Sequence, residues 1–376
     1  MTKMNILIIG NGFDLAHHLP TSYMDFLKLL KSADDKYRLS SAIKSMRTNP
    51  LYNGAYRELF DRFPGLINNL DPNRIRKLED RLQSNVWGAY YAGCEAEING
   101  WIDFEREMIP VFEVLEEVFN CKDTFFEMNN DSSYVEGILL NNELSIKKAT
   151  LLSKYFKIGG HLGKRCVIVK KEYCGKQYGI YKDKILKDLK KELDAFVELF
   201  KEYLEEVVGK IEIQKDSKIS AIEADAVISF NYTATELKYE KLKDAENYHV
   251  HGSVNVPNSI VMGINEMQND PKHTFLYFCK YFQRIRRRIN PQYYSLLSRV
   301  DEGGCVICPR VIFYGHSLDS VDEDILKEFI NNAEKVEIYY YNEEDYENKV
   351  INLIKMFDRR QIEEDLYRNR IEFLKT

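Results

Sequence analysis

The sequence predicts a doubly wound, mainly parallel α/β sheet interrupted by a large helical insertion. Short apolar runs that end in turn residues crowd the two ends of the chain, at residues 4–10 and again after residue 224. Between them, apolar residues recur mostly at helical spacing. Buried strands that alternate with helical stretches form parallel sheets covered on both faces. We therefore expect one α/β domain from residues 1–35 and 216–376, with residues 36–215 inserted as helices.

The expected strands are short and strongly apolar. The first begins at Met4 and stops at Gly10, as a buried strand that leads into a turn does. The others lie at residues 226–230, 248–250, 259–262, 311–314 and 336–341. The clearest helix is expected at about 181–213, where Leu, Val and Phe recur at spacings of three and four with Lys and Glu between them.

Length and composition describe a large globular protein. With 376 residues, the chain exceeds the usual single core, so we expect two compact units or one unit with a large insertion. Hydrophobic residues make up 44% and charged residues 30%, which argues against long disorder. The formal charge of -6 gives no overall attraction to RNA or to an anionic membrane.

Several features predict a cytoplasmic protein without a membrane segment. No run of eighteen apolar residues occurs, and the first apolar run lacks a signal-peptide cleavage pattern. Seven scattered cysteines fit reduced thiols in a reducing compartment. Cys305 and Cys308 form one CxxC, which we expect beside a buried strand, and no second CxxC completes a zinc site. We therefore expect no metal.

The strongest local signal directly follows the first expected strand and reads Gly10-Asn11-Gly12-Phe13-Asp14. Glycines let the backbone approach a ligand closely, and a following helix offers free N–H groups to a phosphate. The dinucleotide fingerprint has a third glycine where this chain has Leu15, so the site is not of the dehydrogenase type. A tight strand-to-helix turn without a ligand explains the two glycines equally well.

Two further polar positions follow expected strands. Asn231 comes directly after residues 226–230, and ligands of open α/β sheets bind beyond the carboxyl ends of strands. It is a candidate for holding a ribose hydroxyl or a water, or else it caps a turn. His251 follows residues 248–250, and Gly252 permits close approach to it. A histidine at a strand end is a natural general base near neutral pH, although a structural histidine gives the same pattern.

A third group of candidates follows residues 311–314. The chain continues Gly315-His316-Ser317-Leu318-Asp319, and a helix is expected to begin near Asp319 or Ser320. Acidic residues in the first turn of a helix suit its dipole but repel phosphate. The position would therefore favour ribose hydroxyls, while an ordinary N-cap accounts for Asp319 as well.

Two charged groups have open roles. Asp103 and Glu105 lie between bulky aromatics and face either solvent or a pocket. We expect the insertion to roof the pocket and to bring these carboxylates near Asp14 or Asn231. The one basic cluster grips phosphates or forms a solvated helix face; its members are Arg284, Arg286, Arg287 and Arg288.

Six motifs, taken in order, resemble the AbiH family of bacterial abortive-infection proteins, which act against bacteriophage. They are IIGNGFDLA (8–16), LPTSY (19–23), WIDFE (101–105), SFNYT (229–233), HGS (251–253) and GHSLD (315–319). Each motif is modest alone, but their joint order is specific. The same order is similar to the wider sirtuin-like defence proteins, in which a GxG turn, an Asn and a His-Gly pair form an NAD pocket.

The resemblance implies a Rossmann-like, sirtuin-like fold that takes NAD as substrate or ligand. By position, Asn231 would hold the nicotinamide ribose or the attacking water, and His251 would be the base. Ser317 and Asp319 would touch the far ribose. The implied cofactor-binding positions are Gly10, Asn11, Gly12, Phe13, Asp14, Gly252, Gly315, Ser317 and Asp319.

The chain also departs from the sirtuin pattern. Asn11 replaces an Ala between the glycines, Asp14 is an additional carboxylate, and Thr233 stands where sirtuins have Asp. The zinc module of deacetylating sirtuins is missing, so deacetylation is not expected. The leading hypothesis is a phage-defence protein that hydrolyses or binds NAD or a related nucleotide.

Two alternatives are a nucleotide sensor or interaction module without turnover, and an RNA-cleaving toxin that would use the insertion and the arginine cluster. A nucleotide is the expected ligand. A phage-derived trigger and a homo-oligomer remain open as partners.

Overall fold

A computed structural model describes residues 4–29, 37–49, 51–95, 104–122, 124–128, 134–140, 148, 152–161, 163–175, 179–265, 273–289 and 291–376. The chain forms two compact units. Unit 1 comprises Met1–Ser22, Val207–Val261 and Gln283–Thr376, and unit 2 comprises Tyr23–Glu206 and Met262–Phe282. Each unit is therefore assembled from segments that are distant in sequence.

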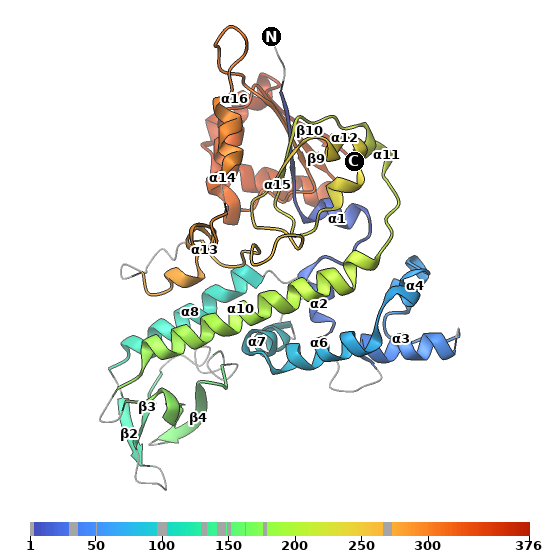
Figure 1. The fold of residues 1–376 in the computed structure, drawn as a ribbon. Coiled ribbons are helices and arrows are strands. Elements are labelled where there is room, and N and C mark those ends of the chain that lie inside the picture. Colours follow the sequence, from blue (N-terminus) through green and yellow to red (C-terminus); the bar gives the residue numbers. More distant parts are fainter. Residues whose placement is uncertain are drawn as a thin grey trace. The chain divides into compact units, whose positions relative to one another are not determined.

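Unit 1 contains a six-stranded parallel sheet (Figure 1). Its order is β10-β9-β8-β1-β6-β7, and each neighbouring pair runs parallel. The N-terminal β1 pairs with β6 on one side and β8 on the other, so the predicted mainly parallel sheet with strands from both ends of the chain is confirmed. The strands are β1 (Asn5–Ile9), β6 (Ala226–Ser229), β7 (Glu246–His249), β8 (Arg310–Tyr314), β9 (Lys335–Tyr340) and β10 (Ile371–Lys375).

The strand order reverses direction at β1. From β1 the chain continues to β6 and β7 at one edge, and then returns to the other side of β1 to add β8, β9 and β10. The next strand of this sheet after β1 is β6, on one side of β1, whereas the next strand after β8 is β9, on the other side. In open α/β sheets, ligands bind outside the carboxyl ends of strands at such a reversal point.

Both faces of the central strands β8, β1 and β6 are buried. Along β1, Ile6 and Ile8 belong to one hydrophobic cluster, whereas Leu7 and Ile9 belong to the other. Since successive side chains of a strand point to opposite faces, a continuous apolar run is what a doubly covered strand requires. The helices of unit 1 include α1 (Asn11–Ala16), α11 (Ser217–Ala221), α12 (Glu240–Lys243), α14 (Glu323–Asn331), α15 (Glu343–Met356) and α16 (Arg359–Tyr367).

Unit 2 is built around α10 (Lys182–Glu206), which confirms the helix predicted from the spacing of its apolar residues. Its buried face packs Phe196 and Phe200 against Phe26, with ring centroids 5.5 and 5.1 Å apart. Phe104 of α8 (Phe104–Asn120) lies 5.0 Å from Phe196. The other helices include α2 (Tyr23–Leu27), α3 (Leu39–Thr48), α4 (Arg57–Arg62), α5 (Leu66–Asn69), α6 (Pro72–Ser84) and α7 (Val86–Glu95).

The expectation of an all-helical insertion is wrong, because unit 2 also contains a four-stranded antiparallel sheet. Its order is β2-β3-β5-β4. The strands are only five or six residues long and carry polar residues. Their alternating apolar pattern is therefore weak beside the helical periodicity of the neighbouring segments. They are β2 (Thr124–Met128), β3 (Tyr134–Ile138), β4 (Phe156–His161) and β5 (Lys164–Val169).

One expected strand of the α/β domain is also wrong. Residues 259–262 are buried but lie outside every strand. The Val261 N–H donates to the His251 carbonyl, so this segment folds back on the turn after β7 and does not join the sheet. Gly252 makes the turn possible, because its φ is 81° and a Cβ there would overlap the carbonyl group of Ser259.

None of the helices in the described part of the chain is both long and apolar enough to cross a membrane.

Candidate functional site

The carboxyl ends of four adjacent strands carry the predicted site residues. Ile9 at the end of β1 lies opposite Ser229 of β6 and Tyr314 of β8, and Ser229 lies opposite His249 of β7. The segments that begin at Gly10, Phe230, Val250 and Gly315 therefore leave the sheet at one edge. The parallel register thus brings the glycine turn, Asn231, His251 and Gly315 to the same edge.

The glycine turn packs directly on the turn after β8. The Gly12 N–H donates to the Gly315 carbonyl over 2.8 Å. A Cβ on Gly12 would lie 2.7 Å from the Gly315 Cα, and a Cβ on Gly10 would lie 2.9 Å from the His316 Cα. Gly315 has φ 66°, and a side chain there would overlap the backbone of Gly12 and Phe13. Close approach of two backbones therefore accounts for these three glycines.

Asn11 and Phe13 have different surroundings within this turn. Asn11 is exposed, and its side-chain oxygen accepts a hydrogen bond from Thr21 over 2.7 Å. Phe13 is fully buried and packs edge-on against Tyr239 and Tyr314. Phe13 is therefore part of the core, while Asn11 remains at the surface.

Asp14 is buried at the first turn of α1. Its carboxylate accepts a 2.5 Å hydrogen bond from the Thr233 hydroxyl, and only 1% of the residue is exposed. Burial raises the pKa of Asp14 to about 6, a rise that Thr233 and Thr235 oppose and that the nearby charge of Glu236 increases. Its second oxygen, Oδ1, has no hydrogen-bond partner among the described residues. Asp14 is thus a carboxyl group that changes charge near neutral pH.

A second buried carboxylate, Glu236, faces His249. The His249 Nε2 lies 3.2 Å from Glu236 Oε1, and its Nδ1 lies 3.3 Å from the Asn231 carbonyl oxygen. Burial lowers the pKa of His249, but Glu236, the Asn231 carbonyl and Asp14 together outweigh this, so the pKa lies above its ordinary value. The structure therefore places an ionisable pair beside Asn231.

Asn231 is 5% exposed, and its backbone N–H donates to the Ser229 hydroxyl over 3.2 Å. The side-chain Nδ2 has no hydrogen-bond partner in the part of the chain that the structure describes. A buried amide donor without a partner is costly, since it has lost its water. Asn231 thus presents an unused donor at the carboxyl edge.

His251 lies against a different carboxylate. Its Nε2 is 3.0 Å from Asp322 Oδ1, and the His316 Nε2 is 3.9 Å from the other oxygen of Asp322. The Phe230 ring packs edge-on against both imidazoles, with centroid distances of 5.4 Å to His251 and 4.5 Å to His316. Two buried histidines therefore share one carboxylate beside the strand end that carries Asn231.

The turn after β8 has largely structural contacts. Asp319 caps the 3-10 turn Ser320–Asp322 by accepting a hydrogen bond from the Val321 N–H over 3.1 Å. Ser317 is exposed, and its carbonyl accepts a hydrogen bond from Asn352 over 3.0 Å. Both side chains nevertheless remain near the carboxyl edge, since they follow β8 by only a few residues.

Three of the remaining charged candidates, Glu105, Arg284 and Arg287, have partners within the fold. Glu105 is buried and pairs with Lys280 at 2.7 Å within unit 2, whereas Asp103 lies outside the described residues. In the arginine cluster, Arg284 pairs with Asp324 at 2.9 Å, and Arg287 donates to the Asn258 carbonyl over 3.1 Å. Arg286 and Arg288 are exposed.

The CxxC cysteines, Cys305 and Cys308, are both exposed and form no disulfide with each other. Over the described ranges of the chain, no group of three or more His, Cys, Asp or Glu side chains has an arrangement that could hold a metal ion.

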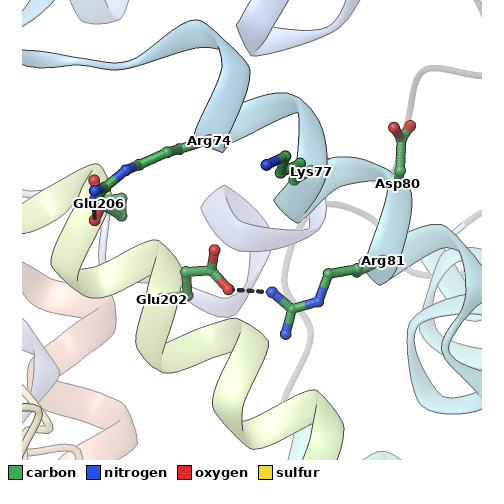
Figure 2. Close-up of a pocket in the computed structure, with 6 residues that line it drawn as sticks. All are labelled: Arg74, Lys77, Asp80, Arg81, Glu202 and Glu206. Atoms are coloured by element: carbon green, nitrogen blue, oxygen red, sulfur yellow. Dashed lines mark hydrogen bonds and ion pairs between the residues drawn. The ribbon is translucent and has the colours of Figure 1, made fainter.

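Unit 2 has a cavity of about 400 Å³ between α6 and α10 (Figure 2). Arg74 pairs with Glu206 at 2.7 Å, and Arg81 pairs with Glu202 at 2.6 Å. These pairs join the two helices, so packing explains the charges. The cavity is lined by Arg74, Lys77, Asp80, Arg81, Glu202 and Glu206, and by none of the predicted site residues.

Sequence reasoning missed Glu236 and the partnership of His251 with Asp322. Glu236 follows Asn231 by five residues, in a stretch without a strand, turn or spacing signal. Asp322 resembles any acidic residue at the start of a helix. Only the path of the chain brings these carboxylates to the imidazoles.

The fold and the carboxyl-edge residues define an α/β protein with a mainly parallel sheet and a buried polar cluster at the point where the strand order reverses. The chain belongs to the AbiH family, because the model of that family, described as "Bacteriophage abortive infection AbiH", matches residues 6–342. This membership implies a role in abortive infection against bacteriophage. No match was found among curated proteins or among solved structures.

Proposed function

We propose that the protein acts in phage defence by binding NAD or a related nucleotide at the carboxyl edge of β8, β1, β6 and β7 and cleaving its N-glycosidic bond. The gathering of Gly10–Gly12, Asn231, His251 and Gly315 at the reversal of the strand order carries this proposal. When the six strands are numbered 1 to 6 in chain order, the sheet reads 3-2-1-4-5-6 from β7 to β10. This is the strand order of doubly wound dinucleotide-binding sheets. This order supports a Rossmann-like, sirtuin-like pocket.

In the proposed reaction, water attacks the ribose carbon that carries nicotinamide. A carbon–oxygen bond forms, the carbon–nitrogen bond breaks, and nicotinamide leaves with the electron pair. His251 accepts the proton of the water, while Asp322 orients the ring and balances its charge. Such a cleavage passes through an oxocarbenium-like state, so a positioned water and one base suffice. The Asn231 amide supplies a hydrogen bond to the water or to the ribose.

The other positions would bind the rest of the nucleotide. Gly10, Asn11 and Gly12 would lie along the phosphates, and Ser317 and Asp319 would contact the far ribose. The N–H groups of Gly10, Gly12 and Phe13 already donate to backbone carbonyls, so phosphate binding would rely on the Asn11 N–H and side chain.

One incubation of the purified protein with NAD, ATP and RNA, followed by mass spectrometry, tests the proposal. We expect nicotinamide and ADP-ribose to appear from NAD, and both to be lost with His251→Ala. Nucleotide that binds but stays intact would overturn cleavage in favour of a sensor. RNA fragments with intact NAD would overturn the proposal in favour of an RNA-cleaving toxin.

A further inference from the structure

The contacts of His249 restrict its protonation to two arrangements. A backbone carbonyl can only accept a hydrogen bond, so the ring nitrogen that faces the Asn231 oxygen carries a proton. The other nitrogen faces a carboxylate oxygen of Glu236 at 3.2 Å. With Glu236 ionised, that nitrogen must also carry a proton, and the ring is an imidazolium.

The burial of Glu236 favours a positive charge on His249. The residue is fully buried, and neither carboxylate oxygen has a well-aligned hydrogen-bond partner among the residues described. A buried carboxylate without a counter-charge is strongly destabilising. The ion pair with His249 supplies that counter-charge. Asp14, the other titratable group facing this pair, adds negative charge and further favours the imidazolium.

We propose that Glu236 and His249 form a positioning pair for Asn231, in which the imidazolium is held by the Glu236 carboxylate and donates its second N–H to the Asn231 carbonyl. The pair fixes the turn that presents the side-chain amide of Asn231. That amide is 95% buried and has an Nδ2 without a partner in the described chain, as a group kept for a ligand oxygen would be. The inference deepens the proposed function and rests on it for the identity of that ligand.

The alternative arrangement is a neutral pair, in which a protonated Glu236 donates to an unprotonated His249 Nε2. It would hold the same atoms together without an imidazolium. The protonation state of His249 therefore separates the two arrangements.

Nitrogen NMR of the whole 376-residue chain, labelled on histidine and asparagine, tests the proposal across a pH titration. We expect both ring nitrogens of His249 to stay protonated above pH 6.5, and the Asn231 amide signals to shift at the same midpoint. Glu236→Gln keeps the shape but removes the charge, and it should lower that midpoint by about 1–3 pH units.

A control variant and an internal reference allow the His249 titration to be interpreted. Glu246→Gln is the matched variant, because Glu246 lies on the same strand but pairs with Arg299 at 2.6 Å, so it should leave His249 unchanged. His17 serves within each spectrum, since burial lowers its pKa. His249→Gln assigns the His249 signals.

The outcomes distinguish this inference from the proposed function. A neutral His249 at pH 6.5 in the unaltered protein would overturn the positioning pair, even if Glu236→Gln failed to fold. Asn231 amide signals that do not shift during the His249 titration would also overturn the positioning pair. The expected titration with NAD left intact would support the pair and contradict NAD cleavage. NAD cleavage with a neutral His249 would contradict the pair alone.

Discussion

The Thr233 hydroxyl donates a 2.5 Å hydrogen bond to the buried carboxylate of Asp14, joining the turn after β6 to the first turn of α1. The identities of these two residues are physically connected. An Asp at position 233 would face Asp14 in a buried site, and like charges so close disfavour ionisation of both. A hydroxyl at 233 instead satisfies one oxygen of the carboxylate.

Asp14→Asn should stabilise the protein at pH 8. The unfolded chain loses the Asp14 proton near pH 3.8, whereas the folded protein loses it near pH 6. Burial of this carboxyl therefore lowers the free energy of unfolding progressively as pH rises from about 4 to 6, and the whole loss is present above pH 6. The difference corresponds to roughly 3 kcal/mol at most. Denaturant unfolding at pH 4 and pH 8 should show a gain at pH 8 that disappears at pH 4.

Asp244→Asn is the control for that comparison, because Asp244 is exposed. It should change stability little at either pH. A loss of stability in Asp14→Asn at pH 8 would contradict the argument and indicate that the ionised carboxylate is needed in the folded protein.

Gly12→Ala and Gly315→Ala should each destabilise unit 1. A Cβ on Gly12 would lie 2.7 Å from the Gly315 Cα, and Gly315 has φ 66°. We expect a loss of roughly 1–3 kcal/mol for each, from overlap or from backbone strain. Thermal unfolding measures it. Gly65→Ala should be neutral or stabilising, since its φ is -71° and a Cβ there meets nothing within 4 Å. Equal effects at all three positions would refute the packing explanation.

Asn231→Ala and His251→Ala should each abolish phage protection while the protein stays folded, because neither substitution empties a large core cavity. Loss of a positioned base lowers a rate about a hundredfold or more, so NAD should persist in infected cells. Plaque counts and cellular NAD measure the two effects. His18→Asn is the control, at an exposed position whose φ of 57° an Asn tolerates.

Protection that survives both substitutions would contradict a catalytic role for Asn231 and His251. Loss of protection by the two variants, when the unaltered protein also leaves NAD intact, would favour the sensor.

Lys280→Met should destabilise unit 2 by roughly 3–5 kcal/mol, because it removes the positive charge that Lys280 places 2.7 Å from the buried Glu105. Adding Glu105→Gln should recover much of the loss. Lys241→Met is matched to it, since Lys241 pairs with Glu223 at a similar distance of 2.6 Å but in an exposed position, and it should change stability little. The four proteins to compare are the unaltered protein, the two single variants and the double variant. If their unfolding curves coincide, burial of the Glu105–Lys280 pair does not affect stability.

Five of the six strands of unit 1 follow from local sequence, whereas β10 (Ile371–Lys375) was not predicted and residues 259–262 were wrongly expected to form a strand. In a run such as residues 4–10, successive positions are apolar, so side chains on both faces of the strand must be buried. This continuous apolar pattern predicts a buried parallel strand. The same logic placed Asn231 and His251 just beyond strand ends. The short strands of unit 2 escaped prediction because a period of two over five polar-containing residues is weak beside helices such as α10.

The sequence by itself determined five of the six strands of unit 1, the residues that follow the carboxyl ends of β1, β6, β7 and β8, and the family to which the chain is similar. The tertiary structure decided the partners: Asp14 with Thr233, His249 with Glu236, and His251 with Asp322. Each of these carboxylate contacts joins residues from different turns of unit 1. Local periodicity reports only which face of an element is buried, whereas the pairing of buried charges depends on how the turns converge.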